Sequence, residues 1–180
     1  MQNILILGAG LSTSTCIRYL LEHSKENHWK ITLGDVNEEL ARKKLGDHPN
    51  GKAIRFDVID ENQKERLISE ADIVISMLPA RFHSLVAESC VRLGRHMVTA
   101  SYVSNGLREL DEEARKKGIL LLNEIGVDPG IDHMSAMQIL DKVRTEGGKV
   151  EVFESSTGGL VAPGSDNNPW KYKFTWNPRN

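Results

Sequence analysis

The chain has 180 residues, 39% of them hydrophobic, which is enough to bury one sizeable core with the beginning of a second domain. Its 23 Lys and Arg residues face 25 Asp and Glu residues, and the net charge of −2 excludes an overall basic field for nucleic acid or an anionic membrane. No apolar run approaches the roughly 18 residues of a membrane span, and "MQNILILGAG" lacks the features of a signal peptide. We therefore expect a cytoplasmic protein with a small-molecule partner.

Six short runs rich in aliphatic and β-branched residues predict strands that are buried on both faces. They cover residues 3–8, 30–35, 53–58, 72–78, 96–100 and 118–122. Segments of helical length separate them, such as residues 80–93, where Phe82, Val86 and Cys90 fall on one apolar stripe. Because parallel strands need crossovers and these crossovers are helical, the alternation predicts an α/β fold built on a doubly wound parallel (Rossmann) sheet.

The first strand runs into "GAGLSTST", residues 8–15, which opens the first helix. Gly8 would permit the tight turn, and Gly10 would let a pyrophosphate approach the backbone amides of the helix N-terminus. Thr13 replaces the third glycine of the usual GxGxxG fingerprint, which predicts a slightly displaced helix whose hydroxyls cap it or contact phosphate. The loop indicates a dinucleotide site, with a plain strand–turn–helix as the alternative.

Asp35 ends the second strand, where a carboxylate can accept hydrogen bonds from the adenosine ribose and would repel a 2′-phosphate. Val36 and Asn37 follow without an arginine to offset that repulsion. The pattern therefore favours NAD over NADP. Asp35 or Asn37 would also serve as the cap of the next helix, and the two roles can coexist.

The third and fourth strand ends extend the same edge. Asp57 and Val58 would lie where an adenine rests, or Asp57 would simply cap the following helix. Pro79 ends the fourth strand because proline lacks an amide donor. Arg81 and His83 would then either reach a substrate carboxylate or remain solvated surface residues.

The two cysteines, Cys16 and Cys90, have no CxxC spacing and no partnering histidine pattern. We expect buried free thiols rather than a redox pair, and no metal site is predicted.

Five motifs, "ISMLPARFH", "VTASYVS", "LNEIGVDPGIDHMSAM", "GGLVAP" and "NNPWKYKFTWNPR", occur in an order and spacing that resemble the saccharopine dehydrogenase (glutamate-forming) family, also called saccharopine reductase. The resemblance covers nearly the whole chain and is densest after residue 72. It implies an NAD(P)-dependent oxidoreductase that acts on a CH–NH bond. The implied reaction is the oxidative cleavage of saccharopine to glutamate and aminoadipate semialdehyde, or its reverse, in lysine metabolism.

The resemblance also implies roles for single residues. Ser101 and Tyr102 would touch the amino-acid substrate, an assignment that comes only from the family; for Tyr102 the alternative is a packed ring with a satisfied hydroxyl. A homodimer is left open as a further partner arrangement. The expected cofactor contacts are Gly8, Ala9, Gly10, Leu11, Asp35, Val36, Asn37, Asp57, Val58, Met77, Leu78, Thr99, Ala100, Val127, Asp128 and Pro129.

The connection after the sixth strand, "NEIGVDPGIDHMS", is unusually polar. Asp-Pro-Gly is a turn signal, and Asp128 or Asp132 would cap the next helix. Turn and cap need only one or two polar residues, whereas Glu124 and His133 stand there as well. Acids near the hydride-transfer centre would bind an ammonium group or accept a proton, and we favour Asp128 as the catalytic group over His133.

Two features depart from the family pattern. Relatives often read "SYCGGLPAP" where this chain reads "SSTGGLVAP", so Thr157 stands in place of a cysteine near the substrate. Thr157 is kept as a substrate contact, although it is neither a comparable nucleophile nor an acid. Family members also commonly bind NADP, whereas Asp35 here points towards NAD.

Residues 1–130 are predicted to form the NAD(P)-binding domain, and residues 131–180 the start of a second α/β substrate domain. "KVEVFESST" would be its first strand, and Trp170, Tyr172, Phe174 and Trp176 would have nothing to bury them. We therefore expect a fragment that binds a dinucleotide but has negligible turnover. The alternatives are a related carboxyspermidine-type dehydrogenase and a non-catalytic dinucleotide-binding module.

Overall fold

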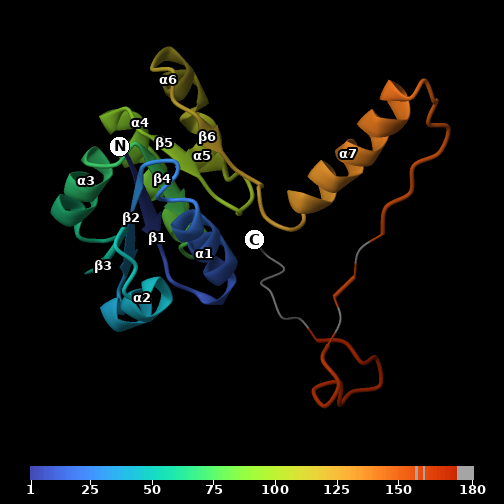
Figure 1. The fold of residues 1–180 in the computed structure, drawn as a ribbon, viewed down its shortest axis with the longest axis horizontal. Helices are drawn as coiled ribbons and strands as arrows, with labels where there is room; N and C mark the ends of the chain where they lie inside the picture. The colour runs from blue at the N-terminus through green and yellow to red at the C-terminus, as the bar shows by residue number, and fades with distance from the viewer. Residues whose placement is uncertain (157, 160, 174–180) are drawn as a thin grey trace. The chain divides into compact units, whose positions relative to one another are not determined.

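A computed structural model of the chain describes residues 1–156, 158–159 and 161–173. The first part of the chain is built around one sheet of parallel strands in the order β3-β2-β1-β4-β5-β6 (Figure 1). The predicted doubly wound parallel sheet is thereby confirmed, with the chain reversing its direction of travel across the sheet between β1 and β4. The strands are β1 (Gln2–Leu7), β2 (Trp29–Asp35), β3 (Gly51–Arg55), β4 (Ile73–Ser76), β5 (His96–Val98) and β6 (Leu121–Leu122).

Helical segments connect the strands and begin at conventional caps. Asn37, Asp60 and Ser104 each accept a hydrogen bond from the backbone N–H three residues further along, so they fix where α2, α3 and α5 begin. The segments are η1 (Leu11–Thr13), α1 (Ser14–Glu22), α2 (Glu38–Leu45), α3 (Glu61–Ser69), η2 (Ala80–Phe82), α4 (His83–Leu93), α5 (Asn105–Glu109), α6 (Asp111–Lys116) and α7 (Ile131–Thr145).

Strand β1 shows why the sheet needs helices on both faces. Ile4 and Ile6 join one buried cluster, which α1 and α2 complete with apolar side chains such as Ile17. Leu5 and Leu7 join the opposite cluster, to which α3, α4 and α5 contribute. Because side chains alternate along a strand, one unbroken apolar run supplies two cores, and the helices cover both sides of the sheet (Figure 1).

The two strands at one side of the sheet are shorter than the sequence predicts. β5 ends at Val98 instead of residue 100, and β6 has two residues instead of five. Just beyond Val98, the amide of Thr99 still donates to the carbonyl oxygen of Leu122 at 2.9 Å, and the buried Thr99 hydroxyl lies near the His83 ring. Strand pairing therefore ends here, where polar side-chain contacts begin.

The thiols differ in burial. Cys90 is fully buried, as expected, and burial raises its pKa to about 12. Cys16 is also free but only half-buried, and burial raises the pKa of its thiol as well. The prediction of a buried thiol was therefore wrong for Cys16, which lies on α1 at the edge of the apolar stripe.

The chain divides into two compact units, Met1–Asp132 and His133–Asn180. In the second unit, the predicted strand is not formed: residues 149–156 have no regular secondary structure. A single strand without a ladder partner is not stable in water, which accounts for the difference. Trp170 is 83% exposed, and Phe174 and Trp176 lie outside the described residues.

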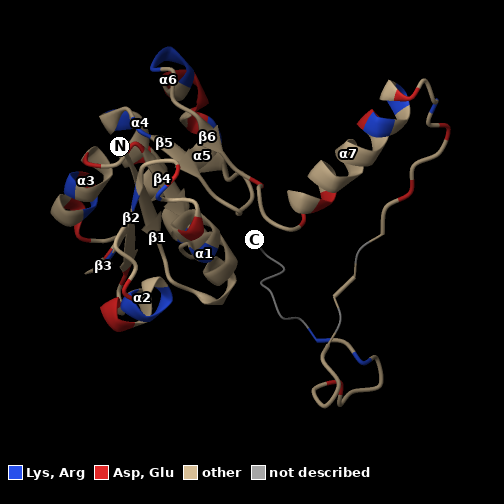
Figure 2. Ribbon diagram, viewed as in Figure 1, with Lys and Arg blue, Asp and Glu red and all other residues tan. Residues whose placement is uncertain are grey.

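Both positively and negatively charged residues occur along several of the helices (Figure 2). In α2 and α6 the first turn is acidic and the last turn is basic, an arrangement that complements the helix dipole. Among the described residues, no helix has both the length and the apolar character needed to cross a membrane.

Candidate functional site

All the strands of the sheet are parallel, so the loops that follow them gather at one edge. Ligands of doubly wound sheets bind at this carboxyl edge, near the point where the strand order reverses. The predicted site residues that the structure describes in the first unit lie in these loops or at the strand ends beside them.

The two glycines of the first loop differ in whether the surrounding structure requires glycine. Gly8 has a φ of +103°, and a Cβ there would stand 2.6 Å from the carbonyl oxygen of Met77, so both conformation and packing demand glycine. Gly10 has a φ of −63°, and an added Cβ would meet nothing within 4 Å. Nothing in the fold requires glycine at position 10, so the open space there suits a ligand that approaches the backbone closely.

Asp35 holds this loop in place. One carboxylate oxygen accepts a hydrogen bond from the amide of Ala9 at 2.7 Å, and the other accepts from the amide of Asn37 at 2.9 Å. Asn37 in turn caps α2 by accepting from the amide of Leu40. Each oxygen of the Asp35 carboxylate therefore accepts one backbone hydrogen bond, a structural role that can coexist with the predicted contact to the ribose.

A cation that the sequence argument missed stands beside the same loop. Lys44, from α2, donates hydrogen bonds to the carbonyl oxygen of Gly10 and, at 2.9 Å each, to the hydroxyls of Thr13 and Ser14. The Thr13 hydroxyl donates back to the Gly10 carbonyl at 2.7 Å, and it makes no cap contact with α1. The expected capping role of Thr13 was therefore wrong: its hydroxyl closes the loop.

Several apolar side chains of this edge are uncovered. Leu11 is 100% exposed and Val36 is 70% exposed. Val58 is buried in the core, so its side chain is not available to a ligand and only its backbone remains. Asp57 is exposed, and its carboxylate accepts from the amide of Ile59, which makes it a turn-forming residue.

The end of β4 lies close to the first loop. The amide of Met77 donates to the carbonyl oxygen of Leu7 at 2.8 Å, and the side chains of Met77 and Leu78 are half-buried. Arg81 is exposed and its guanidinium lies over the ring of Phe82, 4.5 Å from the centroid. The expectation of a solvated surface side chain fits Arg81.

His83 differs from both alternatives that the sequence offered, because only 2% of it is exposed. Its Nδ1 lies 2.8 Å from the hydroxyl of Ser76, and its Nε2 lies 2.7 Å from the hydroxyl of Ser101. Burial lowers the pKa of His83, so the ring is neutral near pH 7. The helix N-terminus that bears His83 packs against the ends of β4 and β5, which is why the side chain points inward.

Two loops next to each other complete the edge. The amide of Glu124 donates to the carbonyl oxygen of Ser101 at 3.0 Å, and the Glu124 carboxylate accepts from the amide of Val103 at 3.1 Å. Glu124 therefore joins the loop after β5 to the loop after β6. Ser101 is half-buried, whereas the Tyr102 ring is 52% exposed and is not packed as the structural alternative would require.

The segment "GVDPG" forms a closed turn. Gly126 donates to the carbonyl oxygen of Pro129 and accepts from the amide of Ile131, and a Cβ on Gly130 would lie 2.3 Å from the Gly126 oxygen. This turn leaves Val127 74% exposed and Asp128 exposed as well. The expected Asp-Pro-Gly turn is thus present, and it presents Asp128 to solvent.

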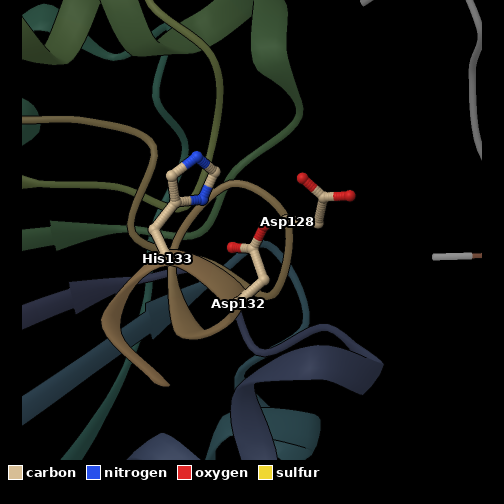
Figure 3. A group of neighbouring side chains, drawn as sticks. All are labelled: Asp128, Asp132 and His133. Carbon is tan, nitrogen blue, oxygen red and sulfur yellow. The ribbon is translucent and has the colours of Figure 1, made fainter. Parts of the chain in front are cut away.

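Three polar side chains lie close together on this short segment. Asp128, Asp132 and His133 each offer one ligand atom within 4.8 Å of the others (Figure 3). One Asp132 oxygen already accepts from the amide of Gly130 at 2.8 Å, so it stabilises the turn before α7. Exposed carboxylates often lie close together without an ion, and this geometry carries no metal assignment.

The predicted cofactor residues thus lie at strand ends or in the loops that follow them, as do Ser101 and Tyr102, although the Val58 side chain is buried in the core. Thr157 lies outside the described residues. Sequence reasoning missed the roles of Lys44, Glu124 and the buried His83. For His83 the spacing offered no signal, because its partners Ser76 and Ser101 stand on other segments of the chain.

Two family models match the chain. The model described as "Saccharopine dehydrogenase NADP binding domain" matches residues 4–122, and the model described as "Saccharopine dehydrogenase C-terminal domain" matches residues 126–180. The chain is 42% identical over 179 residues to the "Saccharopine dehydrogenase [NADP(+), L-glutamate-forming]" of Schizosaccharomyces pombe, which covers 99% of this chain and 39% of that protein. It is also 38% identical over 194 residues to an alpha-aminoadipic semialdehyde synthase of Arabidopsis thaliana, which covers 98% of this chain and 18% of that protein.

A solved structure agrees with these matches. The apo, histidine-tagged saccharopine dehydrogenase (L-Glu forming) from Saccharomyces cerevisiae superposes with a TM-score of 0.78 at 38% identity, covering 99% of this chain and 39% of that one. The chain thus spans about two fifths of the length of the dehydrogenases that it matches. Both the matched model and the dehydrogenases named with a cofactor specify NADP, so the expectation of NAD from Asp35 is not supported.

Proposed function

We propose that this chain, which belongs to the saccharopine dehydrogenase family, binds NADP and serves the oxidative cleavage of saccharopine to glutamate and aminoadipate semialdehyde, or its reverse. Residues 1–130 would form the dinucleotide-binding domain, and residues from 131 onward would belong to the substrate domain. The boundaries of the two matched family models support this division.

One observation carries the cofactor part of the proposal. The open space at Gly10 lies at the end of β1, beside the strand reversal, where a pyrophosphate can approach the backbone amides that begin η1 and α1. Leu11 and Val36 are exposed apolar side chains on the same edge and would be covered by the adenosine part of the ligand. The residues present therefore fit a dinucleotide.

NADP is proposed over NAD for two reasons. The matched relatives that name a cofactor name NADP(+). Within this chain, both oxygens of Asp35 accept backbone hydrogen bonds, which partly offset the negative charge of the carboxylate. Lys44 adds a positive charge at the carbonyl oxygen of Gly10, the residue that follows Ala9, whose amide bonds to Asp35. The repulsion of a 2′-phosphate by Asp35 is therefore weaker than the sequence argument assumed.

Bound NADP would accept a hydride from the carbon next to the secondary amine of the substrate. The chain's own residues would orient that carbon: Ser101 presents a hydroxyl at the end of β5, and Tyr102 adds an exposed ring beside it. Orientation of this kind lowers the barrier because the reacting atoms are held in line before the reaction.

Asp128 is the proposed proton acceptor. It is exposed on the turn between Gly126 and Gly130, and a carboxylate there would take the proton that the amine loses as the C=N bond forms. The closed turn fixes the backbone on both sides of Asp128, so the position from which its side chain extends is fixed as well. Replacement by Asn would keep the shape and remove the base.

Binding is tested on the chain itself. Titration with NADPH and with NADH, followed by reduced-nicotinamide fluorescence, should give a dissociation constant for NADPH at least about tenfold lower, which corresponds to roughly 1.4 kcal/mol. Gly10→Ala is the matched variant, because it alters no packing contact in the protein. Tighter binding of NADH would contradict the proposed cofactor.

Turnover is tested on the product of the complete reading frame. Saccharopine and NADP are added together, and absorbance of the reduced nicotinamide is followed. Asp128→Asn should lower kcat at least about tenfold, and a smaller effect on NADPH affinity would separate loss of the base from loss of a cofactor contact. Tight NADPH binding without saccharopine turnover would keep the cofactor site and move the search to another secondary amine.

A further inference from the structure

His83 and Ser101 form a buried pair at the side of the edge where substrate is expected. The imidazole has a hydroxyl at each ring nitrogen: Ser76 at Nδ1, 2.8 Å away, and Ser101 at Nε2, 2.7 Å away. The Thr99 hydroxyl lies 3.5 Å from Nε2 and accepts from the amide of Ser101 at 3.3 Å. The ring is therefore surrounded by hydroxyl groups that are fixed by β4 and by the loop after β5.

The Ser76 hydroxyl decides which nitrogen carries the proton. Ser76 is 0% exposed, and among the described residues His83 Nδ1 is its only side-chain hydrogen-bond partner. A buried hydroxyl proton needs an acceptor, because leaving it unpaired costs the desolvation of that group. Nδ1 must therefore be the unprotonated nitrogen, and in a neutral imidazole the proton then resides on Nε2.

Protonation at Nε2 sets the role of Ser101. The Nε2–H group donates to the Ser101 hydroxyl oxygen, so the proton of that hydroxyl is not used by His83. Ser101 is only half-buried, and it lies in the loop that follows β5 at the carboxyl edge. Its hydroxyl can then donate outward to an acceptor. The opposite tautomer would turn the hydroxyl proton inward and leave only lone pairs for the ligand.

We propose that His83 is a positioning residue that holds Ser101 as a hydrogen-bond donor towards a carboxylate or carbonyl oxygen of the substrate, and disfavours an ammonium group at that position. This inference rests on the proposed function in one respect, since the substrate side of the edge is assigned through it. His83 itself touches neither substrate nor cofactor, because it lies behind Ser101 in the core.

The tautomer is measured by nitrogen NMR on the labelled chain at neutral pH, without any ligand. Nε2 of His83 should have the chemical shift of a protonated ring nitrogen, and Nδ1 that of an unprotonated one. Ser76→Ala is the matched variant: it removes the donor to Nδ1 and should let the ring become a mixture of tautomers. A native His83 protonated at Nδ1, or at both nitrogens, would overturn the inference.

A second measurement separates positioning from simple structural support. His83→Leu removes the donor, whereas His83→Gln retains an amide N–H that can reach Ser101. Saccharopine affinity, measured with NADPH bound, should fall about tenfold in His83→Leu and be largely restored in His83→Gln, with NADPH affinity unchanged in both. Equal saccharopine affinity in native chain and both folded variants would refute the positioning role.

The outcomes distinguish the two proposals. If the product of the complete reading frame binds NADPH but no saccharopine, the proposed substrate fails, and the tautomer measurement alone decides whether His83 holds Ser101 as a donor. If His83→Leu does not fold, as judged by circular dichroism, the comparison of His83→Gln with His83→Asn replaces it. Asn is too short to place its amide at the position of Nε2, so it should behave like the variant without a donor.

Discussion

The two sides of the carboxyl edge are built in different ways. At the glycine-rich loop, the groups proposed to face the ligand are backbone amides, and side chains such as Asp35 and Lys44 bond to that backbone. At the loops after β5 and β6, side chains bond across long sequence separations, as His83 does to Ser101 and Glu124 does to Val103. A site made of backbone leaves a local motif in the sequence, whereas a site made of side-chain contacts does not.

The largest expected effect comes from the two glycines of the first side. Gly8→Ala places a Cβ at a positive φ and 2.6 Å from a carbonyl oxygen, and should lower the free energy of unfolding by about 3 kcal/mol. Gly10→Ala should leave the free energy of unfolding within about 0.5 kcal/mol of native while weakening NADPH binding about tenfold or more. Urea denaturation and NADPH titration measure both. An equal loss of stability in the two variants would remove the distinction between a packing glycine and a ligand glycine.

The second prediction concerns pH and the other side of the edge. Burial lowers the folded-state pKa of His83 below its usual 6.5, so below that pH the unfolded chain binds a proton that the native chain does not. The buried, neutral His83 ring therefore makes its full contribution to the free energy of unfolding above about pH 6.5. This contribution is lost as the pH falls towards the folded-state pKa, by at most about 1.4 kcal/mol for each pH unit. Urea denaturation at about pH 7.5 and about pH 5.5 should show a smaller decrease for His83→Gln than for the native chain. Identical decreases would mean that His83 is not the titrating group.

The third prediction tests the link between the loops after β5 and β6. Glu124→Ala removes the acceptor for the Val103 amide and should cost about 1 kcal/mol of stability. Glu124→Gln keeps a carbonyl oxygen at that place and should cost less. Hydrogen exchange at the Val103 amide reports the contact directly, and unchanged exchange in Glu124→Ala would show that the carboxylate does not hold this loop.

The smallest effect is expected for Lys44, the cation that bonds to the glycine-rich loop. Lys44→Met keeps the aliphatic stem and removes the hydrogen bonds to Gly10, Thr13 and Ser14, so stability should change by no more than about 0.5 kcal/mol. NADPH affinity should fall about threefold, because positive charge near the phosphates is lost. Lys43→Met, at the exposed neighbouring position, is the control and should leave affinity unchanged.

Much of the first side could be predicted from the sequence. The apolar runs placed all six strands, because strands covered on both faces have few polar residues. Gly8 and Gly10 could be found because a tight turn and a close approach each need glycine within a few residues of a strand end. The direction of the Asp35 carboxylate could not, since its bond to Ala9 spans 26 residues and depends on how the strands pack.

The second side was predicted less well for the same physical reason. The partners of His83 stand 7 and 18 residues away, on β4 and after β5, and no spacing rule connects them. The motif "ISMLPARFH", which ends at His83, therefore gave no indication of a buried imidazole. Likewise, the strand expected over residues 149–156 depends on a neighbouring strand, and apolar alternation alone does not create one.

Strand β6 indicates that the two sides of the edge also differ in local stability. It contributes two residues at one margin of the sheet, and β5 is its only neighbour there, joined through the amides of Met97 and Thr99. Such a short outer strand separates at low free energy, well before the central strands open. Amide hydrogen exchange should therefore be faster in β6 than in β1, which has a hydrogen-bonded neighbour on each side.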